Sequence, residues 1–421
     1  MVTHPALAAV PGPASLSAPA ADPAVATLAF ALGGACLGVA SGLTPGLHAN
    51  AFALLLAGAA PAVPAPPTAL GAAMLAAGVV HTFLDVVPAL ALGVPDAAMA
   101  AGALPGHRLV LAGRGREALR LSALGSGLAL VVALALAAPV TAAVRAGYPF
   151  LRANLSLVLL AVTGFLVLTE GRLRAAVGGA ASFILAAGLG LLTLDLSPAA
   201  PLPVGGTLAP LFAGLFGAPV LLAAMGGAGV PPQDDARIAL DVDAVARPAT
   251  AGAVGGALVG YLPGVSAAVA AVLSLAGLPN RQGARGFLVA TSGANTATAV
   301  FGLFALVSLG TPRTGVLVAV DEVGAPLGLP WLLAVTVLAA AVGFALVPPL
   351  GDRYLAAARR VDATALSAGV LCLLAVTAWL FAGVVGLGVF AAATLVGLVP
   401  PRVGCRRVHL MGVLIGPLLV G

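Results

Sequence analysis

The sequence predicts an all-α polytopic membrane protein, built from two inverted-topology repeats with broken or re-entrant helices in about 10–12 membrane segments. Three observations predict this fold. Hydrophobic residues make up 61% of the 421 residues and charged residues only 8%, too few charges to cover a soluble domain. Apolar stretches of roughly 20 residues, the length of a membrane-spanning helix, recur along the chain. The third observation is a duplicated pair of helix breaks.

The breaks are two Pro-Gly pairs, at 45–46 and 263–264, and each interrupts a long apolar run. Each pair is followed by a Leu-Gly-x-Pro, which ends at Pro95 in the first half and at Pro312 in the second. Pro and Gly interrupt helices, and at membrane depth the freed backbone groups are tolerated only beside protein or a water-filled cavity. Interrupted segments at matching places in two halves point to the binding site of a transporter.

Composition divides the chain into four parts. Residues 1–22, rich in Ala and Pro, have no basic start of the kind that marks a signal peptide and are predicted to be a disordered tail. Residues 23–229 form the first membrane repeat with its following spans, and 248–421 form the second. Residues 230–247 are the most polar segment and are predicted to be the linker between them.

The elements of the first half follow from its apolar runs. The run 23–60 carries the Pro-Gly break and ends in a proline-rich loop at 61–67. A second run, 68–105, leads to the basic loop 106–120. Further spans, each bounded by Arg, Pro or Asp, are predicted at 121–140, 153–170, 175–194 and 208–229.

The second half repeats this order. A broken run at 248–278 is followed by a run at 286–311, which contains a cluster of uncharged polar residues. An apolar tail at 408–421 is too short to cross a bilayer as an ordinary helix. The runs are continuously apolar and do not alternate, which disfavours a β-barrel. Spans are predicted at 329–349, 364–381 and 383–400.

The 19 basic residues are a topology signal. They are all Arg and cluster between apolar runs, so the net charge of +5 predicts no nucleic-acid partner. The strongest cluster of the first half follows Leu-Gly-x-Pro, whereas Arg281 and Arg285 of the second half precede it. If basic loops stay in the cytoplasm, the halves enter the membrane from opposite faces, which favours an inverted repeat. Three isolated cysteines indicate neither a zinc site nor a disulfide framework.

Six motifs together carry a family resemblance. In the first half they are Leu-Gly-Val-Pro-Asp at 92–96, Leu-Pro-Gly-His-Arg at 104–108 and the Gly- and Arg-rich loop at 113–119. In this order the chain resembles the large permease subunit of tripartite tricarboxylate transporters. The second half continues the family's order with the motifs at 263–264, 291–297 and 309–312.

The resemblance implies a polytopic secondary carrier for carboxylates, driven by an ion gradient. It also implies a small membrane subunit and an extracellular substrate-binding protein as partners. The chain departs from the family at Asn295-Thr296, where an Asn-Asn pair is expected, and at His48-Ala49-Asn50 after the first break. With these departures the chain resembles a divergent branch of the family, and the candidate is an archaeal branch.

The predicted substrate site gathers around the two breaks. Amides freed at the start of a half-helix suit an anion, and freed carbonyls suit a cation. Two alternatives remain open, in which the breaks are ordinary kinks and the polar residues of 286–311 only join helices. The predicted substrate-binding residues are Thr44, Pro45, Gly46, His48, Asn50, Pro95, Pro263, Gly264, Ser266, Ser292, Asn295, Thr296, Pro312, Arg313 and Thr314.

The coupling cation is predicted at His81, Asp85 and Asp96. His81 and Asp85 are spaced i, i+4 with Thr82 between them, and intramembrane ionisable groups mark ion pathways. After the two equivalent prolines, Asp96 stands where the second half has Arg313. A carboxylate takes up Na⁺ or H⁺, whereas a guanidinium holds an organic carboxylate. In the alternative these charges are interfacial and only anchor the protein.

The pattern predicts a secondary active transporter, a permease, that moves a small organic anion across the cytoplasmic membrane with Na⁺ or H⁺. No catalytic constellation is visible, so an enzyme is not predicted. No cofactor or metal site is predicted either, apart from Na⁺ as a candidate coupling ion. The alternative is an intramembrane enzyme or a non-transporting assembly subunit. The expected partners are the lipid bilayer, the anion, the two subunits implied by the resemblance and a second copy of the chain.

Overall fold

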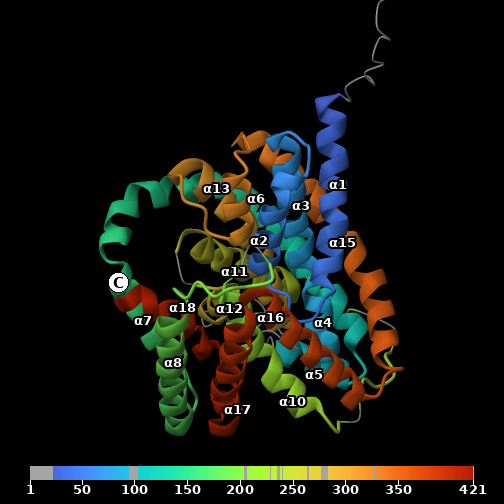
Figure 1. The fold of residues 1–421 in the computed structure, drawn as a ribbon, viewed down its shortest axis with the longest axis vertical. Coiled ribbons are helices and arrows are strands. Elements are labelled where there is room, and N and C mark those ends of the chain that lie inside the picture. The colour runs from blue at the N-terminus through green and yellow to red at the C-terminus, as the bar shows by residue number, and fades with distance from the viewer. Residues whose placement is uncertain are drawn as a thin grey trace, which may run out of the picture.

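The computed structural model describes residues 22–93, 103–202, 206–227, 229–234, 238, 240–262, 265–275, 283–326 and 328–420. Every regular element within these ranges is a helix (Figure 1). The all-helical class is therefore confirmed, whereas the predicted tail up to residue 21 lies outside the described residues. Seven helices are long and apolar enough to cross a membrane: Pro23–Gly42, Pro67–Leu92, Gly115–Ala153, Leu173–Thr193, Gly283–Leu309, Leu329–Ala358 and Ala363–Val403.

The first half forms a chain of long and short helices. Its helices are α1 (Pro23–Gly42), α2 (Ala49–Ala59), η1 (Ala60–Ala62), α3 (Pro67–Leu84), α4 (Val86–Leu92), α5 (Ala103–Leu111), α6 (Gly115–Ala153), α7 (Leu155–Leu168), α8 (Leu173–Thr193), α9 (Leu208–Phe212), the π-helical turn η2 (Ala213–Gly217) and α10 (Ala218–Ala224).

The second half begins inside the range predicted as the linker, since its first helix starts at Val242. Its helices are α11 (Val242–Tyr261), α12 (Ala267–Leu275), α13 (Gly283–Leu309), α14 (Gly315–Glu322), α15 (Leu329–Ala358), α16 (Ala363–Gly397), α17 (Val399–Val403), η4 (Arg407–Met411) and α18 (Gly412–Val420).

The helix breaks fall where Pro and Gly predict them. Between α1 and α2 the chain turns through Gly46, whose φ of 72° a residue with a side chain rarely adopts. α11 and α12 are separated by the matching segment of the second half, of which 263–264 lie outside the described residues. α16 is interrupted at Ala382 and Gly383, at the predicted boundary between two spans.

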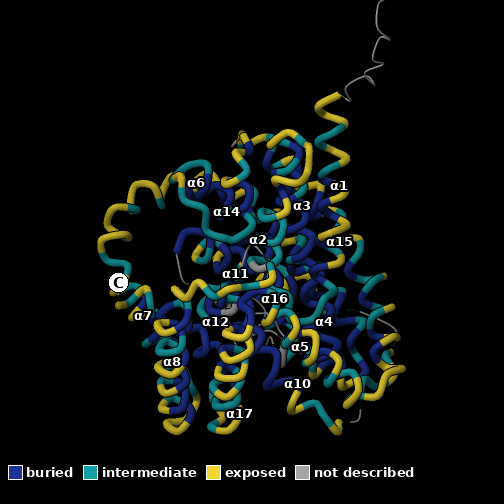
Figure 2. Tube along the Cα trace, viewed as in Figure 1, coloured by how far each residue is buried: buried dark blue, intermediate teal, exposed yellow. Residues whose placement is uncertain are grey.

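The centre of the bundle is formed by α3 with α4 and by α13. Of the most apolar stretch of the span Pro67–Leu92, 94% of residues are buried, and the value for Gly283–Leu309 is 72%. The same value is 28% for α1, which lies at the periphery (Figure 2). Helices at the edge of a membrane protein expose apolar side chains to lipid, so this gradient separates lipid-facing helices from those that form the interior.

A glycine stripe joins each broken helix to the central helix of its own half. Gly34, Gly38 and Gly42 of α1 lie against the α3 backbone, and a methyl group at Gly34 would overlap the carbonyl oxygen of Ala73. The same three-residue stripe recurs in α11 after 218 positions and lies against α13, with a would-be methyl at Gly252 meeting Ala290. Small residues let membrane helices approach closely. The two halves thus use one packing device at the same spacing as their Pro-Gly breaks.

We expect Gly34→Ala to destabilise the protein, because its new methyl group overlaps the α3 backbone, which cannot move aside as a flexible side chain would. Overpacking of this kind costs about 1–3 kcal/mol. Thermal unfolding of the purified protein measures the effect. Gly33→Ala on the same helix is the matched control, since no atom lies within 4 Å of its added methyl. Equal unfolding temperatures for the two variants would contradict the close approach of α1 and α3.

The helix directions can be followed from contacts along the bundle. α1 runs parallel to α3, since Gly34 faces Ala73 and Gly42 faces His81. α11 runs parallel to α13 in the same way, since Gly252 faces Ala290 and Gly260 faces Phe301. Each half therefore contains two parallel helices, and the short helix between them returns the chain across part of the bundle. This unit is α1, α2 and α3 in the first half, and α11, α12 and α13 in the second.

The two units run in opposite directions. α13 is parallel to α6, because Arg285 bonds to Glu117 and Ser292 to Ser122. α15 is antiparallel to α6, since Gly115 faces Leu355 and Gly127 faces Phe344. It is parallel to α3, since Gly71 faces Trp331 and Gly343 faces Phe83. α3 is therefore antiparallel to α13. These directions are those that an inverted repeat requires, and the inverted repeat itself stays a prediction.

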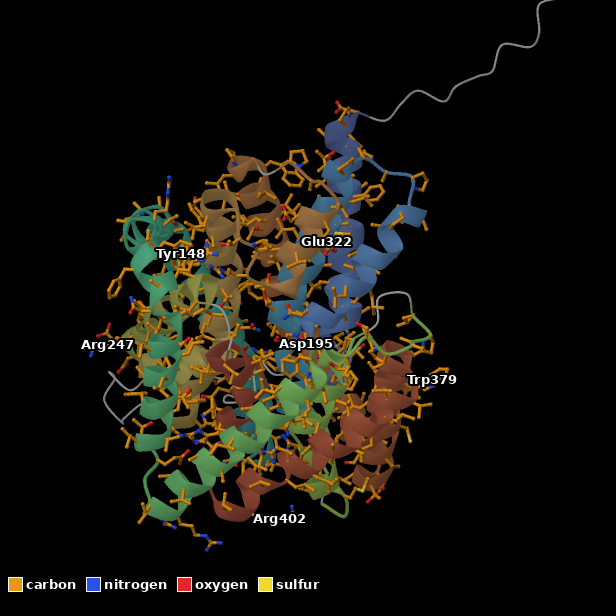
Figure 3. All side chains as sticks on the ribbon, turned by 60° about the vertical axis from the view of Figure 1, so that its left-hand side comes forward. Tyr148, Asp195, Arg247, Glu322, Trp379 and Arg402 are labelled. Carbon is orange, nitrogen blue, oxygen red and sulfur yellow. The ribbon has the colours of Figure 1, made fainter. Side chains whose placement is uncertain are left out.

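The basic loop 106–120, the start of α13 and the end of α15 lie at one end of the molecule, because Glu117 pairs with Arg285 and Arg120 with Asp352. In Figure 3, Arg402 lies at the lower end of the bundle, whereas Glu322, before α15, lies in the upper part.

We expect cysteines placed at Gly113 and Ala357 to be labelled from the cytoplasm and a cysteine at Val63 from outside. The background chain has its three native cysteines replaced. Labelling of Gly113 and Ala357 from different sides would contradict the topology.

Candidate substrate-binding pocket

A cavity of about 180 Å³ lies where the two halves meet. It is lined by the starts of α2, α12 and α14, by the middle of α3 and α13, and by the C-terminal segment. The lining residues are His48, Ala49, Asn50, Leu75, Gly78, Val79, Thr82, Asp85, Phe212, Val259, Val265, Ser266, Ala267, Asn295, Thr298, Ala299, Arg313, Thr314, Val316, Leu317, Met411 and Leu414.

The cavity brings together residues that the sequence predicted from positions far apart. Six of the predicted substrate residues line it, and so does Asp85 of the predicted ion site. Thr82 and Thr298, neighbours of the predicted residues, also face it. The six are His48, Asn50, Ser266, Asn295, Arg313 and Thr314.

Other predicted residues lie away from the cavity wall. The turn at 44–46 faces α16, because a methyl group at Gly46 would overlap the side chain of Leu374. Thr44 bonds through its hydroxyl to the carbonyl oxygen of Ala40. Pro312 precedes Arg313 without lining the cavity.

Two predicted polar residues of α13 and one of α3 are packed between helices. The Ser292 hydroxyl lies 2.7 Å from that of Ser122 on α6, and Thr296 is completely buried. His81 is also completely buried, with its Nδ1 2.9 Å from the Ser41 hydroxyl on α1. His81 and Asp85 therefore contact different helices. The remaining predicted residues, Pro95, Asp96, Pro263 and Gly264, lie outside the described residues.

Three helix starts converge on the cavity, and each begins with a polar cap that lines it. His48 Nδ1 accepts from the Asn50 amide at 3.0 Å, at the start of α2. The hydroxyl of Ser266 accepts from an amide of α12 at 3.4 Å, and that of Thr314 from an amide of α14 at 3.3 Å. The start of a helix carries a partial positive charge and amides without intrahelical partners. This arrangement favours an anion in the cavity.

A hydrogen bond across the halves fixes two of these helix starts together. The side-chain oxygen of Asn50, on α2, accepts from the backbone amide of Gly315 at 2.8 Å, and Gly315 is the first residue of α14. Asn50 therefore caps a helix of the other half while lining the cavity. The starts of α2 and α14 form one wall, which Arg313 and Thr314 continue.

Arg313 brings a full positive charge to this wall. Its Nη2 donates to the Tyr148 hydroxyl at 2.7 Å, and its guanidinium lies 5.8 Å from the centre of the Tyr148 ring. Figure 3 shows Tyr148 on α6, in the upper part of the bundle. The buried Nε of Arg313 has no hydrogen-bond partner among the described residues. A buried donor without a partner costs about 1–3 kcal/mol, which a bound acceptor would recover.

A carboxylate and an amide form a second polar group in the cavity, where α3 meets α13. Asn295 Nδ2 donates to Asp85 Oδ2 at 2.7 Å and lies 3.4 Å from the Thr82 carbonyl oxygen. Asp85 stands at the junction of α3 and α4 and is 6% exposed. A buried carboxylate is costly unless it is hydrogen-bonded, paired with a cation or protonated. This pole therefore suits Na⁺ or a proton.

The third wall is apolar and comes in part from the C-terminal segment. Phe212, Val259, Val265, Met411 and Leu414 line the cavity and belong to one hydrophobic cluster. Sequence reasoning missed these residues and treated 408–421 only as a short tail, because an apolar side chain carries no distinguishing signal in an apolar chain.

An ion-pair cluster holds this C-terminal segment in place. Glu170 Oε1, between α7 and α8, accepts from the backbone amide of Arg406 at 3.0 Å, from its Nε at 2.9 Å and from His409 Nε2 at 2.8 Å. Burial alone would raise the pKa of Glu170, but these hydrogen bonds and the Arg406 charge outweigh it and lower the pKa below its usual range. The ionised carboxylate thus fixes the segment that carries Met411 and Leu414.

Within the described ranges, no three His, Cys, Asp or Glu side chains gather as metal ligands would. Asp85 is the acidic residue and Arg313 the basic residue, other than His48, among the described residues that line the cavity. The cavity therefore offers a positive wall, a carboxylate pole and an apolar wall.

Long apolar helices around a cavity lined by helix starts define the class of multi-pass membrane transport proteins. The chain belongs to the tripartite tricarboxylate transporter TctA family, whose model matches residues 28–412, so the predicted resemblance is confirmed. An uncharacterized protein of the archaeon Methanocaldococcus jannaschii is 25% identical over 407 residues, which span 93% of this chain and 98% of that protein. No solved structure matches the chain.

Proposed function

We propose that the protein is a secondary active transporter that carries a small organic anion, a carboxylate, across the cytoplasmic membrane. The observation that carries the proposal is the convergence of three capped helix starts and Arg313 on one cavity between the halves. A guanidinium binds a carboxylate through two parallel hydrogen bonds, and helix starts add partial positive charge around it. The membership in a transporter family supports this proposal.

The coupling cation, Na⁺ or H⁺, binds at Asp85. Its carboxylate is nearly buried and is hydrogen-bonded by Asn295, so the two halves share the site. A cation there neutralises a buried negative charge, and the anion neutralises Arg313 in the same cavity. Each ligand thus makes the cavity more favourable for the other. The opposite directions of the α1–α3 and α11–α13 units support transport by alternating access.

The partners are those of a tripartite system, a small membrane subunit and an extracellular substrate-binding protein. The family to which the chain belongs supports them through its name, which describes three-part transporters. The lipid bilayer covers the exposed apolar faces of α7, α8 and α16. A second copy of the chain is a further proposed partner.

Uptake by proteoliposomes that contain the purified protein tests the proposal. Labelled citrate, succinate and hexanoate are offered under an inward Na⁺ gradient, a pH gradient or neither. We expect one or more of these carboxylates to accumulate under one gradient and not without it. Co-reconstitution with the small subunit and the binding protein encoded beside the gene, where present, tests the partners. Lack of carboxylate uptake under every gradient, with and without those partners, would contradict the proposed function.

A further inference from the structure

We propose that the substrate is an amphipathic monocarboxylate, with one anionic end and an apolar body, and not a tricarboxylate. This inference rests on the proposed function and names the substrate class for the same cavity. It follows from how charge and apolar surface are distributed over the lining residues.

The full positive charge that the described lining residues supply lies on one wall. Arg313 continues directly into the cap of α14, and the Asn50 hydrogen bond to Gly315 joins the start of α14 to that of α2. Arg313 is the one lining residue with a full positive charge within the described part of the chain. One guanidinium forms a bidentate pair with one carboxylate. The wall therefore accommodates a single anionic end.

A second carboxylate would find no second cationic side chain among the described residues that line the cavity. Asp85 offers it no positive charge, since a bound Na⁺ or H⁺ neutralises this carboxylate without reversing its sign, and Asn295 Nδ2 is already bonded to Asp85 Oδ2. Elsewhere it would meet the apolar wall of Phe212, Met411 and Leu414. Burial of an ionised carboxylate without a partner is strongly unfavourable. The charges of the cavity thus select against succinate and citrate.

The apolar wall suits the body of the substrate. Its five residues form one continuous cluster, which begins next to the positive wall, since the His48 ring lies 4.9 Å from that of Phe212. Leu75 and Val79 of α3 add further apolar surface. An alkyl or aryl group that extends from a carboxylate held at Arg313 would replace water along these side chains. Each buried methylene is worth about 0.8 kcal/mol, which is roughly a fourfold gain in affinity.

The test is binding to the purified protein in lipid nanodiscs, measured by calorimetry with acetate, butyrate, hexanoate, phenylacetate, succinate and citrate. We expect affinity to rise roughly fourfold per methylene from acetate to hexanoate until the cavity is filled, and to be lowest for citrate. Val259→Thr, which keeps the shape but adds a hydroxyl to the apolar wall, should weaken hexanoate several-fold and leave acetate unchanged. Val254→Thr on the same helix is the control, because Val254 is exposed and does not line the cavity.

The outcomes separate this inference from the proposed function. The inference of an amphipathic substrate is overturned if citrate or succinate binds more tightly than hexanoate, or if affinity does not change with chain length. The proposed carboxylate carrier would remain supported in either case. The same holds if Val254→Thr and Val259→Thr have equal effects. Absence of binding and of uptake for every carboxylate would overturn both.

Discussion

Replacement of Arg313 by lysine is expected to raise the half-saturating substrate concentration by about tenfold or more, because lysine keeps the charge but loses the planar fork that binds a carboxylate bidentately. Loss of one charge-assisted hydrogen bond costs about 1.5–3 kcal/mol, which corresponds to this range. The dependence of uptake on the coupling cation should change little. Initial uptake rates over a range of substrate concentrations in proteoliposomes measure both quantities.

The control is Arg145→Lys, since Arg145 lies on α6 close to Tyr148 in sequence, is exposed and does not line the cavity. Tyr148→Phe removes the hydroxyl that accepts from Arg313 Nη2 and should have a smaller effect in the same direction. Unchanged half-saturation in Arg313→Lys would remove Arg313 from the proposed carboxylate site.

Replacement of Asp85 by asparagine is expected to abolish ion-driven accumulation. The variant keeps the size of the side chain but removes its negative charge. Asparagine therefore has no charge to attract Na⁺ and no carboxylate to take up a proton. We expect the half-saturating Na⁺ concentration to rise more than ~10-fold, or the dependence on a pH gradient to disappear. Exchange of substrate across the membrane without a gradient should persist.

Asp321→Asn serves as the control for this change, since Asp321 is exposed near the end of α14 and does not line the cavity. Uptake is compared under a Na⁺ gradient, a pH gradient and no gradient. Accumulation at the normal level in Asp85→Asn would place the coupling cation elsewhere and remove Asp85 from the proposed mechanism.

The helix breaks could be predicted from sequence because Pro and Gly act locally. The turn after α1 and the interruption of α16 at 382–383 lie where the Pro-Gly pair and the gap between apolar runs placed them. The glycine stripes of α1 and α11 were also visible, as Gly-x₃-Gly-x₃-Gly repeated after 218 positions, and would have strengthened the prediction of a duplicated unit. Backbone chemistry thus predicts where a helix stops.

The contacts of a single polar side chain could not be predicted in the same way. Ser292 and Asn295 lie one turn apart on α13, yet one bonds to Ser122 of a neighbouring helix and the other faces the cavity. Which of them faces a partner depends on helix packing across the halves, and periodicity within one helix does not contain that information. The apolar wall had no local signal at all, since Phe212 and Met411 resemble many other residues of this chain.

One helix is connected to both poles of the cavity. α13 is continuous from Gly283 to Leu309, Asn295 lies in its middle beside Asp85, and Arg313 follows four residues after its end. If the cation binds at Asp85 and the anion at Arg313, each ligand acts on a residue that contacts α13 or closely follows it, so both bias the position of the same helix. Thermodynamic linkage then requires reciprocity. The factor by which the bound cation raises the affinity for the anion equals the factor by which the bound anion raises the affinity for the cation. Energy stored in an ion gradient would thereby be converted into a solute gradient through the position of a single helix.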